Sequence, residues 1–210
     1  MLSITKSNLI QGIIPRIIPS GYHLAMKAYA DWRVGALPEE ARNSDFRIVL
    51  TFDDFGTTAQ VNRLLSILDA QCVRGVFFVQ GDWAIKHPRQ LAKIEKAGHI
   101  IGNHTYSHPD LLSLSNDQIR AEISRGVTSP WVRPPRGRYN DRVRRVANEM
   151  GRAIKYWSID SDDWQGTSAE VMSRNILGQL HPSRKCDTAH LHWLVSEPHL
   201  PKEAPKTPNS

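Results

Sequence analysis

Short apolar runs alternate with segments of helical periodicity along most of this chain, beginning near residue 45. The run FRIVLTF (46–52) is rich in β-branched residues and predicts a buried strand. The next segment, TTAQVNRLLSILDAQ (57–71), repeats apolar residues at helical spacing after threonines that can cap a helix. This alternation predicts an α/β fold with a parallel sheet or barrel. We expect further strands at 75–79, 99–101, 130–133 and 153–159, and further helices at 88–99, 115–126, 140–150 and 167–180.

Polar clusters follow the predicted strands. Parallel strands bring their carboxyl ends to one rim, so residues far apart in the sequence are expected to meet in one pocket. Taken alone, an Asp pair after a strand is most often a helix cap, and paired histidines are most often surface residues. Four clusters, each at a strand end, favour a single functional site. In chain order they are Asp53 with Asp54, His104 with His108, Arg133, and Asp160 with Asp163.

The residue types in these clusters predict a metal site. Two imidazoles and one carboxylate form the three-ligand set of a catalytic zinc site, which leaves a fourth position open for water. His104 and His108, four residues apart in GNHTYSHPDL, can face one ion. We assign Asp54 as the third ligand. Asp53 is then left as a base, since a divalent cation lowers the pKa of its water towards about 7. Arg133 can pair with Asp53 and hold it ionised.

Four motifs carry a resemblance to a known family. TFDD (51–54), HTYSH (104–108), RPPRG (133–137) and DSDDW (160–164) resemble, in order and spacing, the first four motifs of the polysaccharide deacetylases, carbohydrate esterase family 4. The resemblance covers about residues 45–180. It implies a distorted (β/α) barrel and the metal-dependent removal of acetyl groups from N-acetylated sugars of peptidoglycan or chitin-like polymers, or in some members of O-acetyl groups.

The resemblance also implies roles for individual residues. Asp53 is the base, Arg133 orients it, and zinc or a similar ion binds Asp54, His104 and His108. Asp160 tunes an acid histidine. The pocket is lined by Trp164, for which ordinary core packing is the alternative interpretation.

Two departures from the family pattern lie beside these motifs. The residue that donates its backbone N–H to the oxyanion is Arg136 here, in place of the usual tyrosine, and a main-chain donor survives that change. Phe55 follows the Asp pair where the family usually has glycine.

The fifth motif of the family, a strand ending in Leu-x-His or similar, is the least clear. TAHLHWLV (188–195) offers His192 as the acid that protonates the leaving amine, and His190 is the alternative because it is one alternation period away. Resemblance falls after Pro182, and the last fifteen residues contain four prolines. We therefore expect a barrel that is incompletely closed at its C-terminal end; a lost reading frame near residue 183 is a second explanation.

We expect an N-terminal extension (1–44), a catalytic domain (45–195) and an irregular proline-rich tail (196–210). Two isolated cysteines, Cys72 and Cys186, predict no disulfide framework. Residues 8–30 are apolar but interrupted, so we predict neither a membrane span nor a secretory signal there, although contact with a membrane surface fits. Cellular location stays open, with the envelope or the exterior implied by the resemblance.

Composition leaves two other function classes to weigh. The net charge of +6 suits an anionic partner, and residues 132–152 hold seven arginines against two acids. This segment lacks the interleaved aromatics of a stacking platform, so we expect no nucleic-acid partner. The other alternative to an enzyme is a catalytically impaired homologue that still binds glycan.

Overall fold

The computed structural model describes residues 47–70, 74–179 and 186–192, the last range as backbone only. In this part of the chain a parallel sheet has the order β5-β4-β3-β2-β1-β7-β6. The α/β class predicted from the alternation is therefore confirmed. The strands are β1 (Arg47–Asp53), β2 (Val76–Val79), β3 (Ile100–Asn103), β4 (Trp131–Val132), β5 (Ala153–Ile154), β6 (Ile159–Asp160) and β7 (Cys186–His192).

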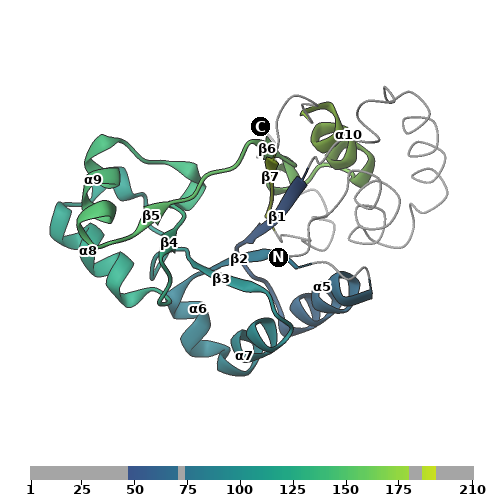
Figure 1. Ribbon diagram of the computed structural model, residues 1–210, viewed down its shortest axis with the longest axis horizontal. Helices are drawn as coiled ribbons and strands as arrows, with labels where there is room; N and C mark the ends of the chain where they lie inside the picture. Colours follow the sequence, from purple (N-terminus) through teal and green to yellow (C-terminus); the bar gives the residue numbers. More distant parts are fainter. Residues whose placement is uncertain (1–46, 71–73, 180–185, 193–210) are drawn as a thin grey trace, which may run out of the picture.

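Helices pack around the outside of this curved sheet (Figure 1). Each predicted helix is present, with ends shifted by a few residues. The short helix α6 was not predicted, because six residues give too little periodicity to detect. The helices are α5 (Thr58–Ala70), α6 (Gly81–Lys86), α7 (Pro88–Lys96), α8 (Asn116–Arg125), α9 (Asp141–Glu149) and α10 (Ala169–Gln179).

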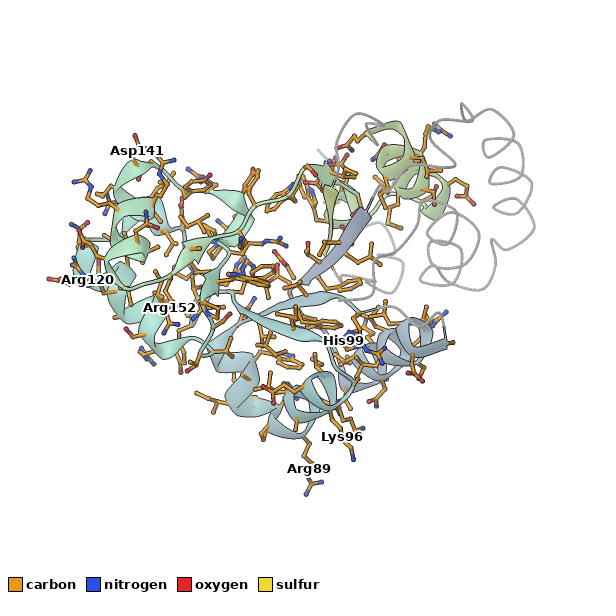
Figure 2. The ribbon with its side chains drawn as sticks, viewed as in Figure 1. Arg89, Lys96, His99, Arg120, Asp141 and Arg152 are labelled. Carbon is orange, nitrogen blue, oxygen red and sulfur yellow. The ribbon has the colours of Figure 1, made fainter. Side chains whose placement is uncertain are left out.

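Helix α7 illustrates why these segments become helices. Pro88 occupies its first turn, where a missing N–H costs nothing. Ile94 is fully buried, whereas Arg89 and Lys96 extend away from the sheet (Figure 2). One apolar stripe against the sheet and one charged face in solvent are the pattern of a surface helix.

Two apolar clusters hold the layers together. The larger one joins β1 and β2 to α5 and α7 through residues such as Phe52, Leu64 and Phe77. The smaller one packs α8 and α9 against β4, around Ile119 and Val143. Each fully buried side chain of this kind contributes about 1.5–3 kcal/mol relative to exposure. The cores therefore anchor the strands whose ends carry the polar clusters.

The prediction of one strand at 153–159 is wrong. The segment forms two short strands, β5 and β6, on opposite edges of the sheet, and the chain between them crosses from one edge to the other (Figure 1). The Arg133 guanidinium satisfies backbone there, with Nε 3.2 Å from the Lys155 carbonyl and Nη2 3.5 Å from the Tyr156 carbonyl. Because the Arg133 side chain donates to these two carbonyls, they keep hydrogen-bond partners where the segment leaves the sheet.

Within the described residues the sheet does not close, in line with the incomplete barrel that we predicted. The gap lies between the edge strands β5 and β6, whereas β7 pairs with β1 on one side and β6 on the other. The predicted N-terminal extension (1–44) and tail (196–210) lie outside the described residues, and so does the apolar segment 8–30. In the part of the chain that is described, no helix is both long and apolar enough to span a bilayer.

Candidate active site

The carboxyl ends of β1, β3 and β4 bring the predicted polar residues together. Asp53 ends β1 and Asp54 follows it, His104 follows β3, and Arg133 follows β4. His108 lies in the loop that follows His104. Five residues spread over more than 50 positions of sequence thus share one end of the sheet, as the rule for parallel strands requires.

Asp54, His104 and His108 form a compact triad. Oδ1 of Asp54 lies 3.6 Å from Nε2 of His104 and 3.5 Å from Nε2 of His108, and one ligand atom from each residue lies within 4.8 Å of the others. Both Nε2 atoms are buried and have no hydrogen-bond partner among the described residues. Two buried, unsatisfied imidazole nitrogens that face one carboxylate oxygen are costly unless they bind something, and a cation fits this donor set.

The tautomer of His104 suits metal binding. Its Nδ1 lies 2.8 Å from the carbonyl oxygen of Arg133. A carbonyl only accepts, so in the neutral ring Nδ1 carries the proton and Nε2 has a lone pair that is available to a cation shared with Asp54. Burial lowers the pKa of His108, and this effect outweighs the opposing charge of Asp54. Near pH 7 that ring is neutral, which is the form that binds a metal.

A buried ion pair lies beside the triad. Nη1 of Arg133 is 2.8 Å from Oδ1 of Asp53, with side-chain exposures of 0% and 2%. The same Nη1 is 2.8 Å from Oγ1 of Thr51, and the guanidinium lies 3.9 Å above the ring of Phe78. Burial lowers the pKa of Arg133 while Asp53 opposes this, yet an arginine stays charged throughout the physiological range. The other oxygen of Asp53 is 3.7 Å from Nε2 of His104, so a fixed carboxylate faces the triad.

Sequence reasoning missed Gln80, which contacts the triad directly. Its Nε2 donates a hydrogen bond of 2.5 Å to Oδ1 of Asp54. Gln80 follows β2 at its carboxyl end, so the rule that located the other clusters could have found it. A single uncharged residue gave no motif to draw attention to it.

Glu122 was also missed, and it shapes the loop between the two histidines. Its carboxylate accepts from the backbone N–H groups of Tyr106 (3.0 Å) and Ser107 (2.9 Å) and from the Ser107 hydroxyl (2.9 Å). Since Glu122 lies on α8, far along the chain from this loop, no local sequence signal indicates the contact.

The remaining predicted residues lie around the triad or further away. Arg136 is exposed, in a turn (Pro135–Gly137) where its φ is +57°. Trp164 is 55% exposed on the short 3-10 helix Asp163–Gln165, which argues against core packing. The carboxylate of Asp160 accepts from Nε1 of Trp157 at 3.0 Å and from the backbone N–H of Asp162 at 3.0 Å.

The two candidate acids, His190 and His192, lie on strand β7, where the register with neighbouring strands gives their backbone positions. His192 is in register with Asp53, whereas His190 is in register with Thr51 on β1 and with Asp160 on β6. The predicted proximity of Asp160 to the acid thus applies, at the level of the backbone, to His190. The side chains of both histidines lie outside the described structure.

Comparison with known proteins agrees with this arrangement. The polysaccharide deacetylase family model matches residues 40–154, more than half of the chain. A peptidoglycan-N-acetylglucosamine deacetylase of Bacillus cereus is 32% identical over 182 residues, which cover 79% of this chain and 66% of the relative. The chain therefore spans slightly less than two thirds of that relative.

Solved structures agree with the sequence comparison. The crystal structure of a peptidoglycan N-acetylglucosamine deacetylase is 32% identical, with a TM-score of 0.65 over 72% of this chain and 73% of the other. A pseudoenzyme of carbohydrate esterase family 4 from Bacillus anthracis is 26% identical, with a TM-score of 0.65 over 71% of this chain and 55% of the other. Sequence, fold and strand-end cluster agree: the chain belongs to the polysaccharide deacetylase family.

Proposed function

We propose that this chain is a metal-dependent hydrolase that removes acetyl groups from N-acetylated sugars of a cell-wall-type polysaccharide, either peptidoglycan or a chitin-like polymer. The proposal rests on the buried Nε2 atoms of His104 and His108, which have no hydrogen-bond partner among the described residues and face Asp54, beside the Asp53–Arg133 ion pair. Deacetylation of peptidoglycan by the similar Bacillus cereus protein supports the choice of substrate.

Asp54, His104 and His108 would hold one divalent cation, with zinc the proposed ion because imidazole and carboxylate ligands suit it. When bound, such a cation would act as a Lewis acid that polarises the acetyl carbonyl and lowers the pKa of water. Asp53 accepts a proton from the attacking water. Arg133 keeps Asp53 ionised and fixes its orientation, because the pair is buried and hydrogen-bonded.

Two further groups complete the reaction. The backbone N–H of Arg136 donates to the oxyanion that forms when water adds to the carbonyl carbon. His192, with His190 as the alternative, protonates the leaving nitrogen as the C–N bond breaks, which yields acetate and a free amine. Asp160 supports the acid, and Trp164 contributes exposed aromatic surface to the sugar.

Acetate release from a chitin oligomer tests this proposal. We expect zinc-dependent release by the chain and a loss of at least about a hundredfold in Asp53→Asn, because that variant lacks the base. Metal content should persist, since Asp53 is not among the proposed ligands. Asp117→Asn, at a side chain that is 96% exposed on α8, is the control and should behave like the parent.

The second candidate is a homologue that binds glycan without turnover. This candidate is supported by the similarity to a pseudoenzyme. It is also supported by the two departures from the family pattern, at Phe55 and Arg136. A chain that binds zinc and glycan oligomers but releases no acetate would support this candidate and exclude the enzyme.

A further inference from the structure

A cavity of about 160 Å³ lies on the inner face of the sheet, on the side away from the helices. Side chains alternate between the two faces of a strand. On β1 and β2 the set that faces the helices, Leu50, Phe52, Phe77 and Val79, belongs to the larger apolar cluster. The other set faces the cavity. In a closed barrel, inward side chains fill this space. Within the described residues the sheet is open between β5 and β6 (Figure 1), so part of the space is left as a cavity.

Most of the cavity wall is apolar. Val76 and Phe78, which are 3% and 1% exposed, line it together with Val49 and Trp131. An apolar cavity of about 150 Å³ is large enough to bind benzene. The cavity on the inner face of the sheet therefore has the size and the lining for one aromatic ring.

The polar groups in the wall are already bonded to protein atoms. Nη1 of Arg133 lies 2.8 Å from Oγ1 of Thr51 and 2.8 Å from Oδ1 of Asp53. Thr51 precedes Asp53 by two residues and faces the same side of β1, so the cavity lies behind the proposed base, toward the amino end of the strand. The interior of the cavity thus offers mainly apolar contact.

A lysine adds a positive charge at the solvent side of the cavity. Lys155 is exposed and lines the cavity, and its Nζ lies 5.2 Å from the centroid of the Trp131 ring. Its backbone is held on both sides, because its N–H donates to the carbonyl of Val132 and its own carbonyl accepts from Nε of Arg133. Among the described residues no carboxylate forms an ion pair with Lys155, and the cavity wall contains no acidic residue. An ammonium beside an apolar cavity favours a ligand that has both a negative charge and an apolar body.

We propose that this cavity is a binding site for a small carboxylate whose apolar body is about the size of one aromatic ring. The ring occupies the space between Val49, Phe78 and Trp131, and the carboxylate pairs with Lys155. This site is separate from the triad, and its existence does not depend on the proposed deacetylation.

Calorimetric titration of the full chain with three probes that share one ring tests the proposal. The probes are benzoate, benzyl alcohol and benzylammonium, and the chain is kept free of metal ions so that no carboxylate can bind a metal at the triad. We expect a Kd of about 1 mM for benzoate, which is in the range for a ligand of this size. Benzyl alcohol should bind about fivefold more weakly, because it lacks the ion pair with a solvent-accessible lysine. Benzylammonium should bind more weakly still, because Lys155 repels it.

Two variants locate the bound probe. Lys155→Met keeps most of the aliphatic side chain, so it should weaken benzoate binding about fivefold and leave benzyl alcohol binding unchanged. Val49→Phe places a ring in the cavity and should remove the binding of all three probes, and urea unfolding checks that this variant folds. Lys96→Met is the control, because Lys96 is exposed on α7 and extends away from the sheet (Figure 2). It should bind each probe like the parent.

Three results would overturn the inference: a parent chain that binds benzoate no more tightly than benzyl alcohol, an equal loss of benzoate affinity in Lys96→Met, or parental binding by a folded Val49→Phe chain. If Val49→Phe does not fold, the comparison of Lys155→Met with Lys96→Met decides. A chain that releases no acetate would refute the proposed function and leave this test unaffected.

Discussion

Replacing Gln80 by leucine should weaken metal binding without touching a ligand. Nε2 of Gln80 donates to Oδ1 of Asp54 at 2.5 Å, and this oxygen is the one that faces both histidines. Asp54 has a φ of +52°, a strained conformation that costs on the order of 1–3 kcal/mol. Gln80 is itself fixed, because it caps the start of α6 and its carbonyl accepts from the N–H of Ala84 within that helix. The contact thus orients a strained ligand from a rigid position.

The size of the effect follows from this contact. A hydrogen bond to a charged group contributes about 1.5–3 kcal/mol. Removing an outer partner of a metal ligand typically weakens metal binding by about 10–100-fold, which is the same range of free energy. Leucine has a similar volume and no donor. We therefore expect zinc affinity to fall about 10–100-fold in Gln80→Leu.

Calorimetric titration measures the zinc affinity without any substrate, and the absorption spectrum of the cobalt-loaded chain reports on the same site. Gln165→Leu is a matched control, since Nε2 of Gln165 donates to a carboxylate oxygen of Asp162 at 3.2 Å on an exposed 3-10 helix. The control should bind zinc like the parent. Parental zinc affinity in Gln80→Leu, or an equal loss in Gln165→Leu, would refute the reasoning.

Two other predictions concern stability. Arg133→Met should lower the free energy of unfolding by about 3–5 kcal/mol, because the carboxylate of Asp53 is left buried without its partner; a loss below about 1 kcal/mol in urea unfolding would contradict this. Burial lowers the pKa of His99 to about 4, and Arg74 adds to this while Asp69 opposes it. The unfolded chain, with an ordinary pKa near 6.5, binds the proton first, so stability should fall by up to about 2 kcal/mol from pH 7 to pH 5. His99→Gln should remove this part of the pH dependence, and an unchanged slope would count against it.

The elements and the triad could be predicted because both depend on local pattern and on one topological rule. Apolar runs located the strands, and the meeting of parallel strand ends located Asp54, His104 and His108. The course of residues 153–159 could not be predicted, because carbonyls of this segment accept hydrogen bonds from the side chain of Arg133, more than 20 positions earlier, in place of a neighbouring strand. Periodicity contains no information about such a partner.

Backbone strain is concentrated around the triad, and it bears on how the proposed metal site is stabilised. Three residues in its two loops, Asp54, Thr105 and His108, have positive φ values of 52°, 64° and 60°. Contacts from outside the motifs restrain these loops, through Gln80 on the first and Glu122 on the second. Folding already holds these strained loops in one conformation, at a cost to the free energy of folding. Metal binding would therefore lose less conformational entropy. For the proposed cation this means that the ligands are already in position, so the residues that determine its affinity include those that hold the loops as well as those that would touch the ion.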